Sequence, residues 1–178
     1  MARVVRKYSE SDNYYQEYYV VNNKIEGDRI AHMNNTPIDI CNWVSDKKNG
    51  ICKSYHTTSP NVKDIFYYIN NKIEGVYKIH FPNGNISCIS NYKNNKLQGE
   101  YIQYTQNGSI KQTKTYDNGI LHGKCIDYYS NGNISSTYNF DNADLHGEYI
   151  TYDYTNANVI KTIKYYDRTR LLKSVNIT

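Results

Sequence analysis

Glycine recurs along this chain at nearly constant intervals, and this spacing constrains the fold more than any other feature. Successive glycines are separated by 23, 25, 24, 24 and 24 residues (50−27, 75−50, 99−75, 123−99 and 147−123). A fixed short period is typical of a repeat architecture, in which one small unit stacks on the next. The repeat-defining positions are Gly27, Gly50, Gly75, Gly99, Gly123 and Gly147.

Each interval predicts a β-hairpin. The residues after Gly99 alternate, with Tyr101 on one face and Tyr104 on the other, as in a strand. Asn107-Gly108 predicts a type I′ hairpin turn, and Asn118-Gly119 predicts a second turn that leads to the next unit. We therefore expect an all-β fold, an elongated single antiparallel sheet of consecutive β-hairpins. The dipeptides equivalent to the first turn are Asn83-Gly84 and Asn131-Gly132.

The fixed period also places like residues in the same position of successive units. Such ladders stabilise a sheet by about 0.2–1 kcal/mol per cross-strand pair, so the core is predicted to be a thin, continuous row. One face is expected to carry Tyr77, Tyr101, Cys125 and Tyr149, and the other Ile102, Ile126, Ile150, Tyr104, Tyr128 and Tyr152. Leu97, Leu121 and Leu145 stand two residues before the glycine.

The repeat does not cover the whole chain. Residues 1–19 lack it and are expected to form an N-terminal capping segment that protects the edge of the array. Residues 20–166 are expected to form about six units, of which the first two are degenerate. Residues 167–178 are expected to form a C-terminal cap or tail, with residues 171–175 as either a last edge strand or a closing turn.

Charge and cysteine content narrow the class of protein. The formal net charge is +4, and the basic residues gather only near the two ends, so no nucleic-acid partner is expected. The four cysteines form no C-x-x-C, and we expect reduced thiols. With no secretory leader or membrane-spanning run in the sequence, a soluble, cytoplasmic protein is expected. The richness in Tyr and Asn, which have AT-rich codons, would also fit a viral protein in a virion or host cytoplasm.

The third regular unit carries the most complete pattern. It runs Tyr116-Asp-Asn-Gly-Ile-Leu121-His-Gly123, followed by Tyr128, Asn131-Gly132 and Ile134. This pattern resembles the MORN repeat in its variant form, and the resemblance covers about residues 20–166. The resemblance implies consecutive antiparallel hairpins and a role in scaffolding and protein–protein contact. It also implies two alternatives, a peripheral phospholipid-binding module and an antitoxin or immunity-type inhibitor of a partner enzyme.

No arrangement of side chains predicts catalysis. His122 and His146 lie one repeat apart, about 10 Å across the sheet, which is too far to share one zinc ion. Glu100 and Glu148 recur directly after the glycine, as expected of a solvated face rather than an acid–base pair. We therefore expect a protein that is not an enzyme and that needs no metal or cofactor.

The tyrosines are the strongest candidates for a contact surface. A single sheet with no covering helix would leave Tyr77, Tyr101 and Tyr149 exposed as an aromatic stripe, and large exposed apolar patches usually mark contacts. Tyr104, Tyr128 and Tyr152 form the second candidate set, on the opposite face. We expect a partner protein, or a second copy of this chain, at the stripe or at a terminal edge strand. A membrane lipid is the lower-ranked partner.

Overall fold

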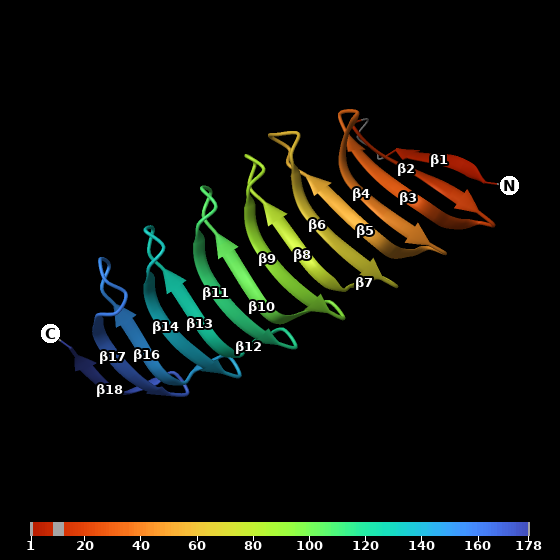
Figure 1. The fold of residues 1–178 in the computed structure, drawn as a ribbon. Helices are drawn as coiled ribbons and strands as arrows, with labels where there is room; N and C mark the ends of the chain where they lie inside the picture. Colours follow the sequence, from red (N-terminus) through yellow and green to blue (C-terminus); the bar gives the residue numbers. More distant parts are fainter. Residues whose placement is uncertain (1, 9–12, 178) are drawn as a thin grey trace. The chain divides into compact units, whose positions relative to one another are not determined.

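The computed structural model describes residues 2–8 and 13–177. Its regular elements are all β-strands, and each strand runs antiparallel to the strands it pairs with (Figure 1). The predicted fold class, an all-β chain of consecutive antiparallel hairpins in a single sheet, is confirmed. The chain divides into two compact units, Met1–Ile86 with Tyr92–Asn95 and Ser87–Asn91 with Lys96–Thr178, and each is described by itself.

The first unit is a series of hairpins in which each strand pairs with the next. Its strands are β1 (Arg3–Tyr8), β2 (Tyr14–Val21), β3 (Lys24–Met33), β4 (Thr36–Val44), β5 (Lys47–Tyr55), β6 (Val62–Ile69), β7 (Lys72–Ile73) and β8 (Gly75–His80). The strand β9 (Ile86–Lys93) contributes residues to both units.

The second unit continues the same pattern from β10 onward. Its last strand pairs with β17 from Thr162 to Asp167, so the end of the chain forms an edge strand rather than a closing turn. The strands are β10 (Lys96–Tyr104), β11 (Ile110–Asp117), β12 (Ile120–Leu121), β13 (Gly123–Tyr128), β14 (Ile134–Asp141), β15 (Asp144–Leu145), β16 (Gly147–Tyr152), β17 (Ile160–Asp167) and β18 (Arg170–Asn176).

Tight two-residue turns connect consecutive strands at one end of the hairpins. Their two central residues both have positive φ, as a type I′ turn requires, and Asn, Asp and Gly tolerate this conformation best. In the turn before β15, φ is 49° at Asn142 and 69° at Ala143. The Ala143 amide donates a hydrogen bond to the Leu121 carbonyl of the preceding hairpin (2.8 Å), and Thr169 repeats this bond to Leu145 (2.8 Å). These turns therefore also join one hairpin to the next.

The Asn-Gly loops, at the other end of the hairpins, differ from the sequence prediction (Figure 1). Gly108 has a φ of 89°, but Asn107 does not have positive φ, so the predicted type I′ turn is wrong. Instead, the Gly108 amide donates to Thr105 O (2.9 Å) and the Thr105 amide to Ser109 O (2.9 Å), which closes a three-residue loop. The Asn107 carboxamide accepts a hydrogen bond from the Ser109 amide (3.2 Å), and this local bond favours the longer loop. The loops at Asn83-Gly84 and Asn131-Gly132 share this arrangement.

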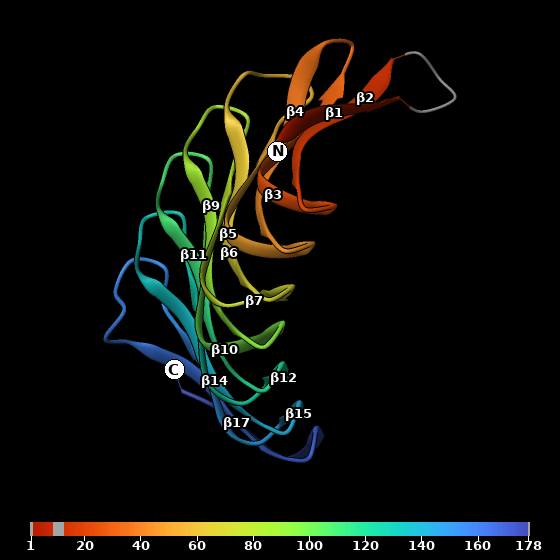
Figure 2. The ribbon, with the colours of Figure 1, turned by 90° about the vertical axis from the view of Figure 1, so that its right-hand side faces the viewer.

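The repeat-defining glycines all have positive φ. The angle lies between 75° and 89° at five of them and reaches 118° at Gly50. At Gly99 an added Cβ would meet no atom within 4 Å, so the backbone angle, and not a lack of space, requires glycine. In Figure 2 the short strands β7, β12 and β15, which precede three of these glycines, curl away from the course of the longer strands.

The core is thin, as predicted, and consists largely of small side chains on one face. Cross-strand pairing joins Cys125 to Tyr138, and both are buried. The other buried residues on the described strands are Ala31, His32, Cys41, Cys52, Cys88, Ser90 and Ser136. A single sheet has no second layer to bury large side chains, and therefore most other described residues of the strands stay half-buried or exposed.

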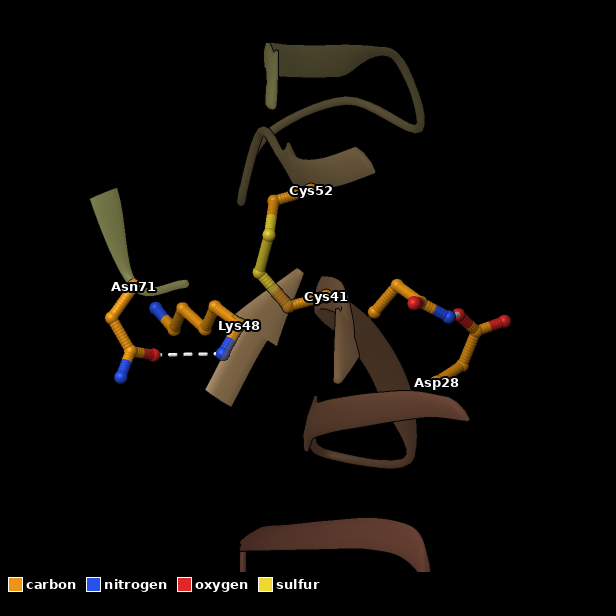
Figure 3. Close-up of a disulfide and its surroundings, with 6 residues drawn as sticks. Asp28, Cys41, Lys48, Cys52 and Asn71 are labelled. Atoms are coloured by element: carbon orange, nitrogen blue, oxygen red, sulfur yellow. Dashed lines mark hydrogen bonds between the residues drawn. A yellow bond between two sulfur atoms is a disulfide. The ribbon is translucent and has the colours of Figure 1, made fainter. Parts of the chain in front are cut away.

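The expectation of four reduced thiols is wrong for two of the cysteines. Cys41 of β4 and Cys52 of β5 form a disulfide, with their Cα atoms 4.2 Å apart (Figure 3). The register between the two strands places these residues directly opposite each other, which their separation of 11 residues does not reveal. Cys88 and Cys125 are free and buried, and burial raises the pKa of each thiol.

Candidate functional site

The tyrosines of the predicted stripe are half-buried rather than exposed. The Tyr77 ring stacks on Phe66 in the first unit, with ring centroids 4.7 Å apart. In the second unit Tyr149 stacks on Tyr138 at 5.1 Å, and Tyr101 meets Tyr116 edge-on at 6.0 Å. Stacked and edge-on pairs stabilise the sheet by about 0.5–1.5 kcal/mol each beyond the area they bury. These rings therefore hold neighbouring strands together.

The second candidate set lies at the ends of three equivalent strands in the second unit. Tyr104, Tyr128 and Tyr152 each sit at a register shift, opposite the first residue of the returning strand. All three are half-buried. The Tyr152 hydroxyl lies 3.3 Å from Thr137 Oγ1, so one ring has a polar partner within the sheet. Their equivalence agrees with the repeat, and nothing in their geometry distinguishes them as a contact surface.

A polar network accompanies the tyrosines of the second unit. Asp127 accepts hydrogen bonds from Gln112 and from Ser136 Oγ (2.9 Å), and Gln112 also donates to the Tyr138 hydroxyl (3.1 Å). Burial, together with the nearby Asp127 carboxylate, raises the pKa of Tyr138. The phenol is thus held neutral and the carboxylate is satisfied inside the sheet. This network has the features of a structural element, with no nucleophile or base left open to a substrate.

The histidines pair with carboxylates of their own hairpins. His122 Nδ1 lies 3.5 Å from Asp141 Oδ1, and His146 Nδ1 lies 3.5 Å from Asp167 Oδ1. Both pairs are exposed, so each contributes little to stability. Within residues 2–8 and 13–177, no three metal-ligating side chains lie close enough to share an ion.

The first unit contains a ladder of alternating rings and cations that the sequence pattern did not predict. Arg29 lies over the rings of Tyr18 (6.0 Å) and Trp43 (5.1 Å), and Lys48 lies over Trp43 (6.0 Å) and Tyr68 (4.9 Å). Cations attract the faces of aromatic rings, so both charges are held in place. We call this set, Tyr18, Arg29, Trp43, Lys48 and Tyr68, the cation ladder.

Two exceptions to the repeat pattern in the sequence could have indicated the cation ladder. Arg29 stands two residues after its glycine, where other units have Tyr or Cys. Lys48 stands two residues before its glycine, where other units have Leu or Ile. Arg29 and Lys48 are charged, whereas the equivalent residues of the other repeats are mostly apolar or aromatic and pack against their neighbours. Such exceptions to a repeat pattern are expected at functional sites.

The first unit carries an apolar groove on β5, β6 and β8. The groove lies on the face opposite to the one that carries the buried Cys52. Four side chains in it are well exposed, namely Ile51 (56%), Tyr67 (42%), Ile69 (47%) and Val76 (48%). Pairing places Ile51 directly opposite Tyr67. These four residues, with Ile65, Glu74 and Lys78, line a hollow of about 570 Å³. We call this surface the apolar groove.

Comparison with known families identifies the regular part of the chain. The family described as "MORN repeat variant" matches residues 73–94, 97–118 and 121–142, each of which spans one hairpin. This region therefore matches three consecutive MORN repeats of the variant type, within the longer stretch whose sequence resembles that repeat. Among curated proteins, none matches the sequence. The cation ladder lies outside the three matched repeats, and so do Ile51, Tyr67 and Ile69 of the apolar groove.

The described residues include no helix that is long and apolar enough to cross a membrane.

Proposed function

We propose that this protein is a repeat scaffold that binds another protein through the apolar groove. MORN repeats in a β-repeat sheet fit a scaffold, and proteins of this family are generally not enzymes. The observation that carries the proposal is the exposure of four neighbouring apolar side chains, Ile51, Tyr67, Ile69 and Val76. Contiguous exposed apolar surface of this kind usually marks a contact, since it is costly to leave in water.

The groove is a better candidate than the tyrosine stripe because, within the described residues, its four exposed side chains stack on no other ring. Tyr77 and Tyr149 already stack on Phe66 and Tyr138, so much of their apolar surface is used within the chain. A partner that inserts apolar side chains between Ile51 and Val76 would bury surface that the fold leaves open. Glu74 and Lys78, one of each charge, would supply polar contacts at the groove.

The proposal is tested by affinity capture with the wild type and two variants in parallel. Ile51→Ser combined with Val76→Ser removes two groove side chains that are exposed, so circular dichroism should still report the native sheet. A partner captured by the wild type should be lost by this double variant. Ile120→Ser is the matched control, because Ile120 is exposed at 47% on β12, far along the chain from the groove residues and away from both terminal strands.

The same experiment separates the alternatives. A partner retained equally by all three proteins would place the contact elsewhere, at a terminal edge strand or on the tyrosine stripe, and would refute the groove. Sedimentation of the wild type and the double variant tests whether the partner is a second copy of the chain. Concentration-dependent association lost in the double variant would identify the groove as a surface for self-association.

A further inference from the structure

A small pocket lies beside the cation ladder, on the face of the first unit that carries the buried cysteines. It has a volume of about 130 Å³, and its lining includes Gln16, Arg29, Asp39, Cys41, Trp43 and Lys48. In Figure 3 Lys48 lies next to the disulfide of Cys41, and its backbone amide donates a hydrogen bond to Asn71 Oδ1 (2.7 Å). The pocket is therefore built on strands that a disulfide and a neighbouring turn hold together.

The two cations of the pocket are not neutralised by contact with a carboxylate. In the part of the chain that the structure describes, neither Arg29 nor Lys48 forms an ion pair within 4.0 Å. Arg29 donates a hydrogen bond to the neutral Gln16 carboxamide. Asp39 is the one acidic residue of the lining, so the pocket carries a net charge of about +1 (two cations, one carboxylate). Burial raises the pKa of Asp39, while the charges of Lys48 and Arg29 lower it.

The pocket lining also includes an uncharged hydrogen-bond donor, Trp43. The Trp43 indole N–H is buried and has no hydrogen-bond acceptor among the described residues. A buried donor without an acceptor is costly, and such a group in a native structure calls for an explanation. Trp43 lines the pocket, so an anion that reached this N–H would supply the missing acceptor and would also balance the excess positive charge.

We propose that this pocket binds an anionic group, a carboxylate or a phosphate, between Arg29 and Lys48 with Trp43 as a further donor. Guanidinium and ammonium groups form short, strong hydrogen bonds to both kinds of anion. The rings of the cation ladder keep the two charges in place, so little side-chain order has to be gained on binding. The proposal does not depend on the apolar groove, which is lined by other residues.

A second hollow gives room for the rest of a ligand. It has a volume of about 270 Å³ and shares Tyr14, Gln16 and Arg29 with the pocket, and it adds Lys7 and Tyr8. Lys7 brings a further positive charge. The anionic group would thus sit at Arg29, and an attached organic part would extend toward the rings of Tyr8 and Tyr14.

The chain provides its own probe, because Trp43 is its single tryptophan. Inorganic phosphate and acetate are titrated in turn at constant ionic strength, with sodium chloride replaced stepwise. We expect a saturable change in tryptophan fluorescence and a shift of the indole N–H resonance in proton–nitrogen spectra. The two probes distinguish a phosphate ligand from a carboxylate ligand. No saturable change with either probe would overturn the proposal.

The repeat itself supplies variants that should fold. Lys48→Leu and Arg29→Tyr each install a residue that other units have in the same position. Each should keep the native circular dichroism spectrum and weaken binding about tenfold or more, as expected for loss of one charged hydrogen bond. Lys48→Arg should retain binding because it keeps the charge. The matched control is Lys53→Gln. Lys53 is an exposed cation on the same strand as Lys48, β5, and it does not line the pocket.

Each outcome decides the proposal. Binding that is lost in both repeat-restoring variants and retained in Lys48→Arg and Lys53→Gln supports a specific anion site. Equal binding by the wild type and Lys48→Leu would show that the fluorescence change reports general salt effects, and the proposal would be wrong.

Discussion

In the regular repeats, the position two residues after the glycine holds Tyr101, Cys125 or Tyr149, and these side chains pack along one face. In the first repeat of the array the same position holds Arg29, which lies between two rings and forms no ion pair with a carboxylate of the described residues. The glycine conformation is equivalent in the two regions, since Gly27 and Gly99 have φ values of 77° and 78°. Similar antiparallel hairpins thus support ring stacking in one region and a charged pocket in the other.

The comparison shows how a repeat can gain a specific site. The turns and glycines fix the hairpin, so the residues between them are free to change without loss of the fold. The matched repeats at residues 73–142 keep the family pattern, whereas the hairpins before them have changed it at several positions. The largest departures, Arg29, Lys48 and the disulfide, lie on neighbouring strands and line or border one pocket.

The largest expected effect separates two glycines, one from each region. At Gly50 φ is 118° and an added Cβ would lie 3.1 Å from the Asn42 Cβ, whereas at Gly99 the space is open. Gly50→Ala should therefore lower the free energy of unfolding by about 3 kcal/mol, since strain and a clash add. Gly99→Ala should cost about 1 kcal/mol, the strain of a left-handed backbone alone. Urea denaturation of both variants measures the difference, and equal losses would contradict the structural distinction.

The disulfide offers the second test of the comparison. The disulfide closes a loop between residues 11 apart in sequence and so restricts the unfolded chain. Replacement of both cysteines by serine should lower the free energy of unfolding by about 2–3 kcal/mol. Hydrogen exchange should show the loss of protection in β4 and β5, while the amides of β13 and β14 stay protected. Cys125→Ser is the control, because Cys125 is a free thiol in the regular region. A uniform loss of protection over the whole chain would show that the two regions unfold together.

The smallest effect concerns the tyrosines of the regular region. Tyr149→Ser removes a ring that stacks on Tyr138 and should lower the free energy of unfolding by about 1 kcal/mol, beyond the loss of buried area. Tyr19→Ser is a suitable control, because Tyr19 is exposed at 51% on β2. Thermal denaturation compares the two variants. A larger loss from Tyr19 would mean that the stripe is less important for packing than its geometry indicates.

Much of the fold followed from the sequence because its determinants are local. The 24-residue spacing, the alternation around Tyr101 and the paired turn residues such as Asn94-Asn95 each act within a few residues. The same local logic explains the error at Asn107-Gly108. The dipeptide suits a type I′ turn, but the Asn107 side chain bonds to the Ser109 amide and favours a loop one residue longer.

The sites were decided by the tertiary structure, because they depend on which residues face each other across strands. Register places Cys41 opposite Cys52 and Arg29 beside Trp43, and one shift of a single residue would send these side chains to the other face. The packing of side chains along each face then determines exposure, which left Tyr149 half-buried and Ile51 open to solvent. The sequence alone determined the repeat and its hairpins; the pairing of strands determined where the two proposed sites lie.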